Sequence, residues 1–382
     1  MIMKNNNENK ILNVPNLRFP EFSGEWENCQ IANILSIGSG RDYKHLEKGN
    51  IPVFGTGGYM TSVNECIYDG ETTFIGRKGS INKPFYYNGK FWTVDTLFYT
   101  HSFNKTTPKF VYCLFQTINW LRYNEASGVP SLSKDTIEKI KVFIPQLDEQ
   151  RKISEMLSVI DERIATQNKI IEKLQSLIRG LSDNIHRDIK GETVCFSGVG
   201  EAYSGLSGKS GDDFGDGEPF ITYMNVYQNT YISEKDYEFV QIAPNERQNC
   251  VQYGDALFTL SSETPEEVGI GAVYLGNTQK LYLNSFCFGI HFYDERVLPQ
   301  YLAHFISSFS FRKAIYPLAQ GSTRFNLQKN DFMKMKFVLP TLEEQERIAK
   351  TLDALHYCMA NEKSLLEQYI LLKRYLLSQM FI

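Results

Sequence analysis

Residues 132–161 read LSKDTIEKIKVFIPQLDEQRKISEMLSVID, and residues 327–356 read LQKNDFMKMKFVLPTLEEQERIAKTLDALH. Both stretches belong to a longer repeat, in which residues 131–181 match residues 326–376 without a gap at a constant offset of 195. Fifteen of the 51 aligned positions are identical, and many others exchange one apolar residue for another, so the two copies share one burial pattern. An offset of half the 382-residue chain indicates a single duplication and not a solenoid of short units.

Each copy predicts a short strand that leads into a long helix. Ile140, Val142 and Ile144 alternate with other residues, as on a strand with one buried face, and Pro145 ends this pattern. Glu149 then falls in the first turn of the expected helix, where a carboxylate interacts favourably with the helix dipole.

Each expected helix carries an apolar seam with the heptad spacing of a coiled coil. Two matching seams favour packing of the helices against each other, whereas one seam alone would equally suit an ordinary core helix. Each helix can extend over roughly 40 residues, or about 60 Å at 1.5 Å per residue. Polar Gln167 lies on the first seam, where such a residue can fix the register. The residues assigned to these helices are Gln150, Ile153, Leu157, Ile160, Ile164, Gln167, Ile171 and Leu174 in the first copy, and Gln345, Ile348, Leu352, Leu355, Met359 and Leu366 in the second.

Two blocks of a different composition alternate with these helices. Both are rich in Gly, Asn, Ser, Thr and aromatic residues, with short β-branched runs that predict strands joined by glycine turns. A short helix near the end of each block also repeats, PKFVYCLF at 108–115 and PQYLAHFI at 299–306, at an offset of 191. We therefore expect an α+β fold with two mixed α/β domains, two long helices and pseudo-two-fold duplication. The expected parts are a disordered leader at 1–16, a first domain at 17–145, a spacer helix at 146–187, a second domain at 188–340 and a second spacer helix at 341–382.

The composition excludes several classes of protein. Hydrophobic residues make up 42% of the chain, yet no stretch approaches ~18 uncharged apolar residues, so neither a disordered chain nor a membrane span is expected. Seven scattered cysteines without a CxxC pair predict a reduced, cytoplasmic protein without a structural zinc site. No P-loop, HExxH, GxSxG or complete GxGxxG motif is present, so we expect no catalytic residue, no metal and no bound cofactor.

Several loops carry residues that suit contact with DNA. Arginine can bond guanine O6 and N7 together, lysine and serine suit phosphate oxygens, and asparagine suits adenine. The formal net charge of -4 hides a difference between the blocks, because residues 17–141 hold 14 Lys+Arg and 12 Asp+Glu, whereas residues 190–340 hold 12 and 17. The chain alone is therefore expected to bind DNA weakly. The candidate DNA-binding residues are Arg41, Lys44, Arg77, Lys78, Ser80, Lys83, Tyr86, Thr222, Tyr223, Asn225, Ser261, Ser262, Thr323, Arg324 and Asn326.

The motifs resemble those of a known family. Leu17-Arg18-Phe19-Pro20 and Gly24-Glu25-Trp26 lie near the start, and an apolar-Pro-x-Leu-x-Glu-Gln sequence occurs at 144–150 and again at 339–345. Together with the loop at 321–327, this arrangement resembles the specificity subunit of type I restriction–modification systems over nearly the whole chain. In the first copy, residues 126–130 match the family's loop more loosely.

The resemblance implies that each block is a target recognition domain for one half of a split DNA site. The two long helices would then pair antiparallel as a spacer. Two modification subunits would bind around the spacer and methylate adenine, and motor-nuclease subunits would complete the restriction enzyme. In such a complex S-adenosylmethionine, ATP and Mg²⁺ belong to the partner subunits.

Two other hypotheses remain at this point. A coiled-coil scaffold with two protein-binding lobes would show no sequence-selective DNA binding even with its partners present. An enzyme with two sites, such as one acting on carbohydrates, would need paired carboxylates that persist through the duplication. Matching Asp and Glu residues outside the helical repeat are scarce.

Overall fold

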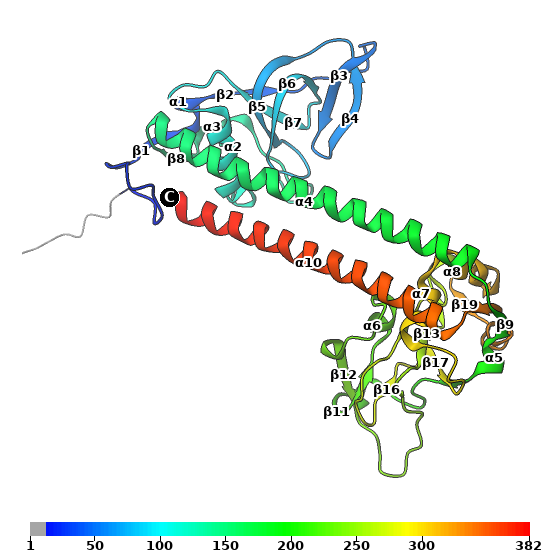
Figure 1. Cartoon of the computed structure of the whole chain (residues 1–382). Coiled ribbons are helices and arrows are strands. Elements are labelled where there is room, and N and C mark those ends of the chain that lie inside the picture. The colour runs from blue at the N-terminus through cyan, green and yellow to red at the C-terminus, as the bar shows by residue number, and fades with distance from the viewer. Residues whose placement is uncertain (1–12) are drawn as a thin grey trace, which may run out of the picture. The chain divides into compact units, whose positions relative to one another are not determined.

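The computed structural model describes residues 13–382, which form two compact units (Figure 1). The first unit contains the chain up to Asn168 together with Ser364–Ile382, and the second contains Lys169–Lys363. Within the first unit, the part that precedes the first long helix is called domain 1. Within the second unit, the part between the two long helices is called domain 2.

Domain 1 is built around a six-stranded sheet, drawn in blue and cyan in Figure 1. Its strand order is β2-β7-β5-β6-β3-β4, and every neighbouring pair except β3–β6 is antiparallel. Aromatic rings fill its interior, where Phe74 lies 5.3 Å from Phe54 and 4.7 Å from Phe91 between ring centroids. The strands are β2 (Ser36–Ser39), β3 (Lys48–Gly55), β4 (Gly58–Val63), β5 (Tyr68–Gly76), β6 (Phe85–Thr93) and β7 (Leu97–His101).

A two-stranded sheet, β1 (Glu27–Gln30) with β8 (Lys141–Ile144), lies next to the start of the first long helix, α4 (Leu147–Asp188). Helix α2 (Pro108–Thr117) begins where Thr107 Oγ1 accepts a hydrogen bond from the Phe110 amide, and proline is its first residue. The remaining helical segments of domain 1 are α1 (Ile31–Ile34), α3 (Lys134–Lys139) and the 3-10 turn η1 (Trp120–Tyr123).

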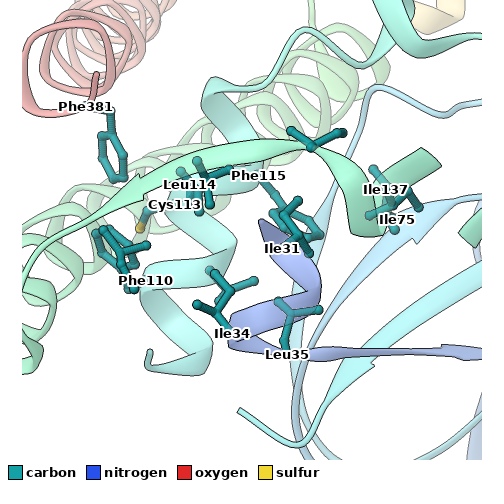
Figure 2. Packing of buried hydrophobic residues seen from close by; sticks show 14 of the residues in the cluster. Ile31, Ile34, Leu35, Ile75, Phe110, Cys113, Leu114, Phe115, Ile137 and Phe381 are labelled. Atoms are coloured by element: carbon teal, nitrogen blue, oxygen red, sulfur yellow. The ribbon is translucent and has the colours of Figure 1, made fainter. Parts of the chain in front are cut away.

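The core of the first unit joins domain 1 to parts of both long helices (Figure 2). Ile153 and Leu157 near the start of α4 belong to the same buried cluster as Met380 and Phe381 at the end of α10 (Leu342–Met380). The Phe381 ring stacks on Phe110 of α2 at 5.4 Å between centroids. Since the start of α4 packs beside the end of α10, the two helices run antiparallel in this unit.

Domain 2 is divided among four small sheets. The largest has the antiparallel order β10-β17-β13-β15, and the others are β12-β11-β16, β14-β19-β18 and β20-β9. The strands are β9 (Glu192–Cys195), β10 (Gly200–Ser204), β11 (Phe214–Ile221), β12 (Tyr237–Val240), β13 (Ala256–Thr259), β14 (Ser261–Ser262), β15 (Gly271–Val273), β16 (Tyr282–Leu283), β17 (Cys287–Phe292), β18 (Ala319–Gln320), β19 (Phe325–Leu327) and β20 (Lys336–Leu339).

Helices of domain 2 pack on the other parts of the two long helices. Leu181 and Ile185 near the end of α4 pack against the buried cluster that contains Ile348 and Leu352 near the start of α10, so the helices are antiparallel in this unit as well. The helical segments of domain 2 are α5 (Phe196–Val199), η2 (Gly211–Asp213), α6 (Tyr223–Gln228), η3 (Glu234–Asp236), η4 (Pro265–Glu267), α7 (Pro299–Ser307), α8 (Phe309–Ile315), η5 (Tyr316–Leu318) and α9 (Lys329–Met333).

The duplication extends further than the sequence repeat. The segment β1-α1-β2 of domain 1 has its counterpart in β9-α5-β10 of domain 2, at an offset of 165 residues from Glu27 to Glu192. Their pairings also agree, since β1–β8 corresponds to β9–β20 and β2–β7 to β10–β17. The two domains therefore share one frame whose middle parts have diverged.

The sequence predictions of this frame are confirmed. Strands β8 and β20 and helices α2 and α7 lie where expected, and the α+β class with two mixed domains and two long helices is correct. The seams form the buried sides of the helices, with Ile153, Leu157, Ile348 and Leu352 at most 1% exposed. The other seam residues, Ile160, Ile164, Gln167, Ile171, Leu174, Leu355, Met359 and Leu366, are buried or half-buried.

The predicted domain boundaries stay a prediction, and two features of the structure bear on them. Most of the predicted disordered leader lies outside the described residues, but Asn13, at its end, is held in place because its carbonyl accepts a hydrogen bond of 2.8 Å from the Trp26 amide. The spacer helices do not form a separate unit. Each helix divides between the two units because its seam buries apolar side chains against whichever domain lies beside it.

Candidate nucleic-acid interface

Two basic groups of domain 1 meet at the turn between β6 and β7. The backbone N–H of Arg41 donates to the carbonyl of Thr93, and that of Arg77 donates to the carbonyl of Thr96, both at 2.8 Å. The Arg77 guanidinium also donates to the carbonyl of Asp95 at 3.3 Å and lies 5.9 Å from the centre of the Phe98 ring. Arg41 and Arg77, 36 residues apart in the sequence, thus flank one short turn.

The loop that follows Arg77 is joined to a loop distant in sequence. Gly79, at φ +84°, donates its N–H to the carbonyl of Pro130 at 2.8 Å, and the Leu132 N–H donates to the Arg77 carbonyl at 2.9 Å. A left-handed φ favours glycine at this position. Residues 77–80, 94–96 and 126–131 therefore form one surface, called edge 1, on which Lys78 is exposed.

Domain 2 repeats these contacts with different residues. The Leu260 N–H donates to the Phe286 carbonyl and the Leu327 N–H donates to the Leu260 carbonyl, each at 2.8 Å. These bonds correspond to those that Arg77 makes with Thr96 and Leu132 in domain 1. Residues 260–263, 284–286 and 321–326 accordingly form edge 2, with Ser261 paired to Asn326 where Lys78 is paired to Ser131.

Edge 2 borders a hollow of about 310 Å³ that also contacts helix α6. The Tyr223 hydroxyl donates to the Ser261 carbonyl at 2.9 Å, and its ring stacks on Tyr227 at 6.0 Å between centroids. Burial raises the pKa of the Tyr223 hydroxyl, and both Tyr223 and Arg324 line the hollow. The hollow is lined by Tyr223, Met224, Tyr227, Ser261, Ser262, Glu263, Glu267, Phe286 and Arg324.

Four of the predicted DNA-binding residues therefore gather at one hollow: Tyr223, Ser261, Ser262 and Arg324. The hydroxyl of Ser262 donates to the carbonyl of Thr264, and both serines are less than 9% exposed. Their backbones thus shape the hollow more than their hydroxyl groups do. Thr323 and Asn326 are exposed on the same edge.

Asn225 has a structural role, which corrects the prediction, and the half-buried Thr222 caps the same helix. Thr222 accepts a hydrogen bond of 3.1 Å from the Asn225 N–H at the start of α6. Asn225 is 2% exposed, and its amide group bonds both the carbonyl and the N–H of Ser233. An amide that is buried and already paired on both sides is not free to contact a base.

The other predicted residues of domain 1 differ in their exposure and in the side chains that they contact. Ser80 belongs to edge 1 and is exposed, as are Lys44 and Lys83 in the neighbouring loops. Tyr86 donates its hydroxyl to the Glu71 carboxylate, and its ring lies 6.1 Å from that of Tyr112 on α2. The Tyr86 pKa is raised by burial and by this carboxylate, so the side chain is held within the domain.

Sequence reasoning missed several residues of these edges: Val129 on edge 1, and Tyr227, Glu263, Glu267 and Phe286 at the hollow. The repeat offset of 195 could have identified Val129, because it pairs this residue with Arg324. The others lie in segments that have diverged between the two domains.

Among residues 13–382, no group of three or more His, Cys, Asp and Glu side chains is arranged to hold a metal ion. Within the same residues, no helix is both long enough and apolar enough to cross a membrane. The chemistry that the edges offer is that of binding: cations, hydroxyl groups, carboxylates and aromatic rings on exposed loops.

Comparison with known proteins agrees with this arrangement. The family model of the type I restriction modification DNA specificity domain matches residues 23–176 and again residues 192–369. The chain belongs to this family. The two matched segments contain most of each copy of the repeat, so the specificity domain occurs twice in one chain.

Individual members of the family are distant in sequence. A protein of Haemophilus influenzae named as a type I restriction enzyme specificity subunit is 22% identical over 367 residues, covering 86% of each chain. The MjaVIII specificity subunit of Methanocaldococcus jannaschii is 24% identical over 273 residues, covering 64% of this chain and 62% of its own.

Two solved structures show the same fold. The type I restriction–modification S subunit of M. genitalium matches 97% of this chain and 99% of its own, with a TM-score of 0.63 and 14% identity. A structure from work on complex assembly and conformational transition of the type I R-M system matches 93% and 97%, with a TM-score of 0.57 and 15% identity.

Proposed function

We propose that this specificity-family chain reads a split DNA site, with domain 1 binding one half-site through edge 1 and domain 2 binding the other through edge 2. The observation that carries the proposal is the equivalence of the two edges. The same backbone bonds hold loops that present Arg77, Lys78 and Val129 in one domain and Arg324 in the other. A shared frame with different exposed side chains suits two related but unequal half-sites.

The long helices are the spacer in this proposal. Helix α4 has 42 residues and α10 has 39, and each continues without a break from one unit into the other. A continuous helical connection would turn two weak half-site contacts into one strong contact that depends on the gap, because binding of one half raises the effective concentration of the other.

Partner subunits would bind the outer faces of these helices. Apolar side chains that are at least 36% exposed occur along both helices: Val159, Ile170 and Leu177 on α4, and Tyr357, Leu365, Leu371, Leu372 and Tyr375 on α10. Exposed apolar groups on a helix suit burial against another protein.

We propose two adenine-methylating modification subunits as those partners. Motor-nuclease subunits would join through them, and the complex would form in the cytoplasm. S-adenosylmethionine, ATP and Mg²⁺ would be bound by the partners, and this chain would itself be non-catalytic.

The experiment that tests the proposal maps adenine methylation in DNA from cells with and without this chain, each supplied with its modification subunit. We expect a split sequence motif to be methylated only when the chain is present. An unchanged methylation map would refute the proposal and would favour the alternative of a coiled-coil scaffold that binds proteins.

The spacer role has a separate test. Four residues, about one helical turn, are inserted into both helices near Gln167 and Glu362. The accepted gap between the half-sites should become longer while the half-sites themselves stay the same. Retention of the original gap would show that the helices do not set it.

A further inference from the structure

We propose that edge 2 reads a G·C base pair, with Arg324 bonding guanine and Glu263 accepting a hydrogen bond from the paired cytosine. This inference rests on the proposed function and adds the identity of one base pair to it. It starts from the hollow of about 310 Å³ on edge 2, which both side chains line.

Both groups are available to a ligand. Arg324 and Glu263 are exposed, and among residues 13–382 neither side chain has a hydrogen bond or ion pair to another residue. Arg312, which lines another hollow of the second unit, differs from Arg324, because it donates to the carbonyls of Glu266, Val268 and Gly269 and is thereby used within the fold. An exposed guanidinium without an internal partner keeps all five of its N–H donors for recognition.

The surroundings of Arg324 favour a base edge over a phosphate group. Glu263 and Glu267 line the same hollow, and two carboxylates there repel a phosphate oxygen through like charge. A G·C pair in the major groove instead presents guanine O6 and N7 as acceptors beside the cytosine N4 amino donor. One cation and one carboxylate therefore match the two halves of this pair.

The hollow is held in shape by bonds that do not involve the two reading groups. Tyr227 donates its hydroxyl to Glu267 at 2.7 Å, and Tyr223 donates to the Ser261 carbonyl at 2.9 Å. The stacked tyrosines fix one wall, and Phe286 lies 56% exposed at the rim. Glu267 is partly committed to Tyr227, which leaves Glu263 as the carboxylate that serves the cytosine.

Edge 1 offers a different chemistry at the same place. The residue that corresponds to Arg324 at the repeat offset is Val129, which is 66% exposed. Lys78 occupies the position of Ser261, since it pairs with Ser131 as Ser261 pairs with Asn326. Two residues further along, Ser80 stands where edge 2 has Glu263, so edge 1 has no carboxylate at this position. The requirement for a G·C pair at this place is therefore specific to the half-site that domain 2 reads.

The test uses the complete chain in complex with its modification subunits and a set of duplexes in which each base pair of the methylated site is replaced in turn. Methylation rates are compared for the wild-type complex and for Arg324→Ala, Arg324→Lys and Glu263→Gln. We expect the wild type to require G·C at one position of one half-site. Arg324→Ala should lower the preference for G·C at that position at least tenfold, while the preferences at all other positions stay unchanged. Arg324→Lys should lose the same preference, because lysine lacks the paired donors of arginine.

Lys313→Ala is the matched control, since Lys313 is an exposed cation of α8 outside edge 2. It should leave every base preference unchanged. If Arg324→Ala instead weakens binding to all sequences equally and lowers its salt dependence, Arg324 contacts phosphate and the inference is wrong, although the proposed function stands. If the wild-type complex shows no sequence preference in either half-site, the proposed function itself fails.

Discussion

Gln150 and Gln345 occupy the same position in the two halves of the chain and make the same three hydrogen bonds. Both side chains are 0% exposed. Each amide group donates to the carbonyl of the proline five residues earlier and to a carbonyl in the loop before a short helix, and each amide oxygen accepts from a backbone N–H of that loop. The partners are Pro145, Lys105 and Thr107 for Gln150, and Pro340, Arg296 and Leu298 for Gln345. The glutamine thus fastens the start of each long helix to α2 or α7.

Replacing Gln150 by alanine should destabilise the first unit by about 2–4 kcal/mol, because backbone groups at the loop and at Pro145 lose their buried partners. The three tryptophans, Trp26, Trp92 and Trp120, all lie in domain 1, so tryptophan fluorescence during urea unfolding reports on that unit. The exposed Gln368→Ala on α10 is the control and should change the midpoint little. Equal midpoints for Gln150→Ala and the control would show that the glutamine does not fasten the helix.

The ion pair between Arg18 and Glu149 predicts a non-additive mutant cycle. Two guanidinium nitrogens reach the two carboxylate oxygens at 2.8 Å each, and the Glu149 side chain is only 2% exposed. Arg18→Met should cost about 3–5 kcal/mol, because it leaves a buried charge without its partner. The double variant Arg18→Met with Glu149→Gln should be more stable than Arg18→Met alone. Urea unfolding of the four proteins provides the measurement, and strictly additive effects would contradict a direct pairing.

Glycine and tyrosine face each other on equivalent strands of the two domains, in opposite orders. Gly38 on β2 is opposite Tyr99 on β7, whereas Tyr203 on β10 is opposite Gly289 on β17. A methyl group on either glycine would lie 2.1 Å from Cζ of the facing tyrosine, so each ring covers the backbone of its partner. Each glycine leaves space for that ring.

We expect Gly38→Phe alone to destabilise domain 1 by about 3 kcal/mol or more, because two rings cannot occupy the space. Adding Tyr99→Gly should recover most of that loss, since the double variant reproduces the order found in domain 2. Phenylalanine is chosen in place of tyrosine because the tyrosine hydroxyl of domain 2, that of Tyr203, donates to the carboxylate of Asp255. Domain 1 has Thr72 at the position that corresponds to Asp255 and therefore lacks this carboxylate. Fluorescence-monitored unfolding would reveal the rescue, and a double variant no more stable than Gly38→Phe would contradict it.

Buried histidines of the second unit should make it sensitive to acid. Burial lowers the pKa of His186, and the neighbouring His304 lowers it further, while a hydrogen bond with the Ser182 carbonyl and the Asp183 charge oppose this. Because the pKa of His186 is lower in the folded state, the unfolded chain binds more protons than the folded chain once the pH falls below the ordinary value of 6.5. The stability that neutral His186 allows is therefore present above pH 6.5 and is lost as the pH falls toward the folded-state pKa.

His186→Asn should reduce this acid loss, because asparagine can keep the donor to Ser182 without titrating. Hydrogen exchange of the amides of α7, compared at pH 8 and at pH 5.5 after correction for the intrinsic exchange rate, measures the effect. His45→Asn, at an exposed site of domain 1, serves as the control. If the difference between the two pH values is the same for both variants, His186 does not contribute to the acid sensitivity.

Edge 1 should contribute to the salt dependence of DNA binding. Replacing Arg77 and Lys78 by alanine in the complex with partner subunits should weaken binding to all sequences, and the slope of log affinity against log salt should fall by about one for each phosphate group that the variant no longer neutralises. Lys109→Ala with Arg122→Ala removes two exposed cations elsewhere in domain 1 and is the charge-matched control. An unchanged slope in the Arg77 and Lys78 variant would remove edge 1 from the interface.

Much of the frame could be predicted because its signals are local or repeat at a constant offset. The seam from Ile153 to Leu174 needs only heptad spacing, and α2 and α7 are visible as a second repeat. The leader prediction missed the hydrogen bond between Asn13 and Trp26, because no pattern in sequence indicates a single backbone bond between loops. Polarity alone also misassigned Asn225, since an amide looks the same in sequence whether it faces solvent or bonds Ser233 in the interior.

The sequence by itself determined the duplication, the two long helices and the strand that precedes each of them, because periodic burial and repeated motifs follow from the order of residues. Only the tertiary structure decided which loops form each edge. Arg77, Thr96 and Leu132 are far apart along the chain and meet through backbone hydrogen bonds that any residue except proline can donate. Such bonds leave no mark on residue type, so the residues at an edge were free to diverge while the frame beneath them stayed the same.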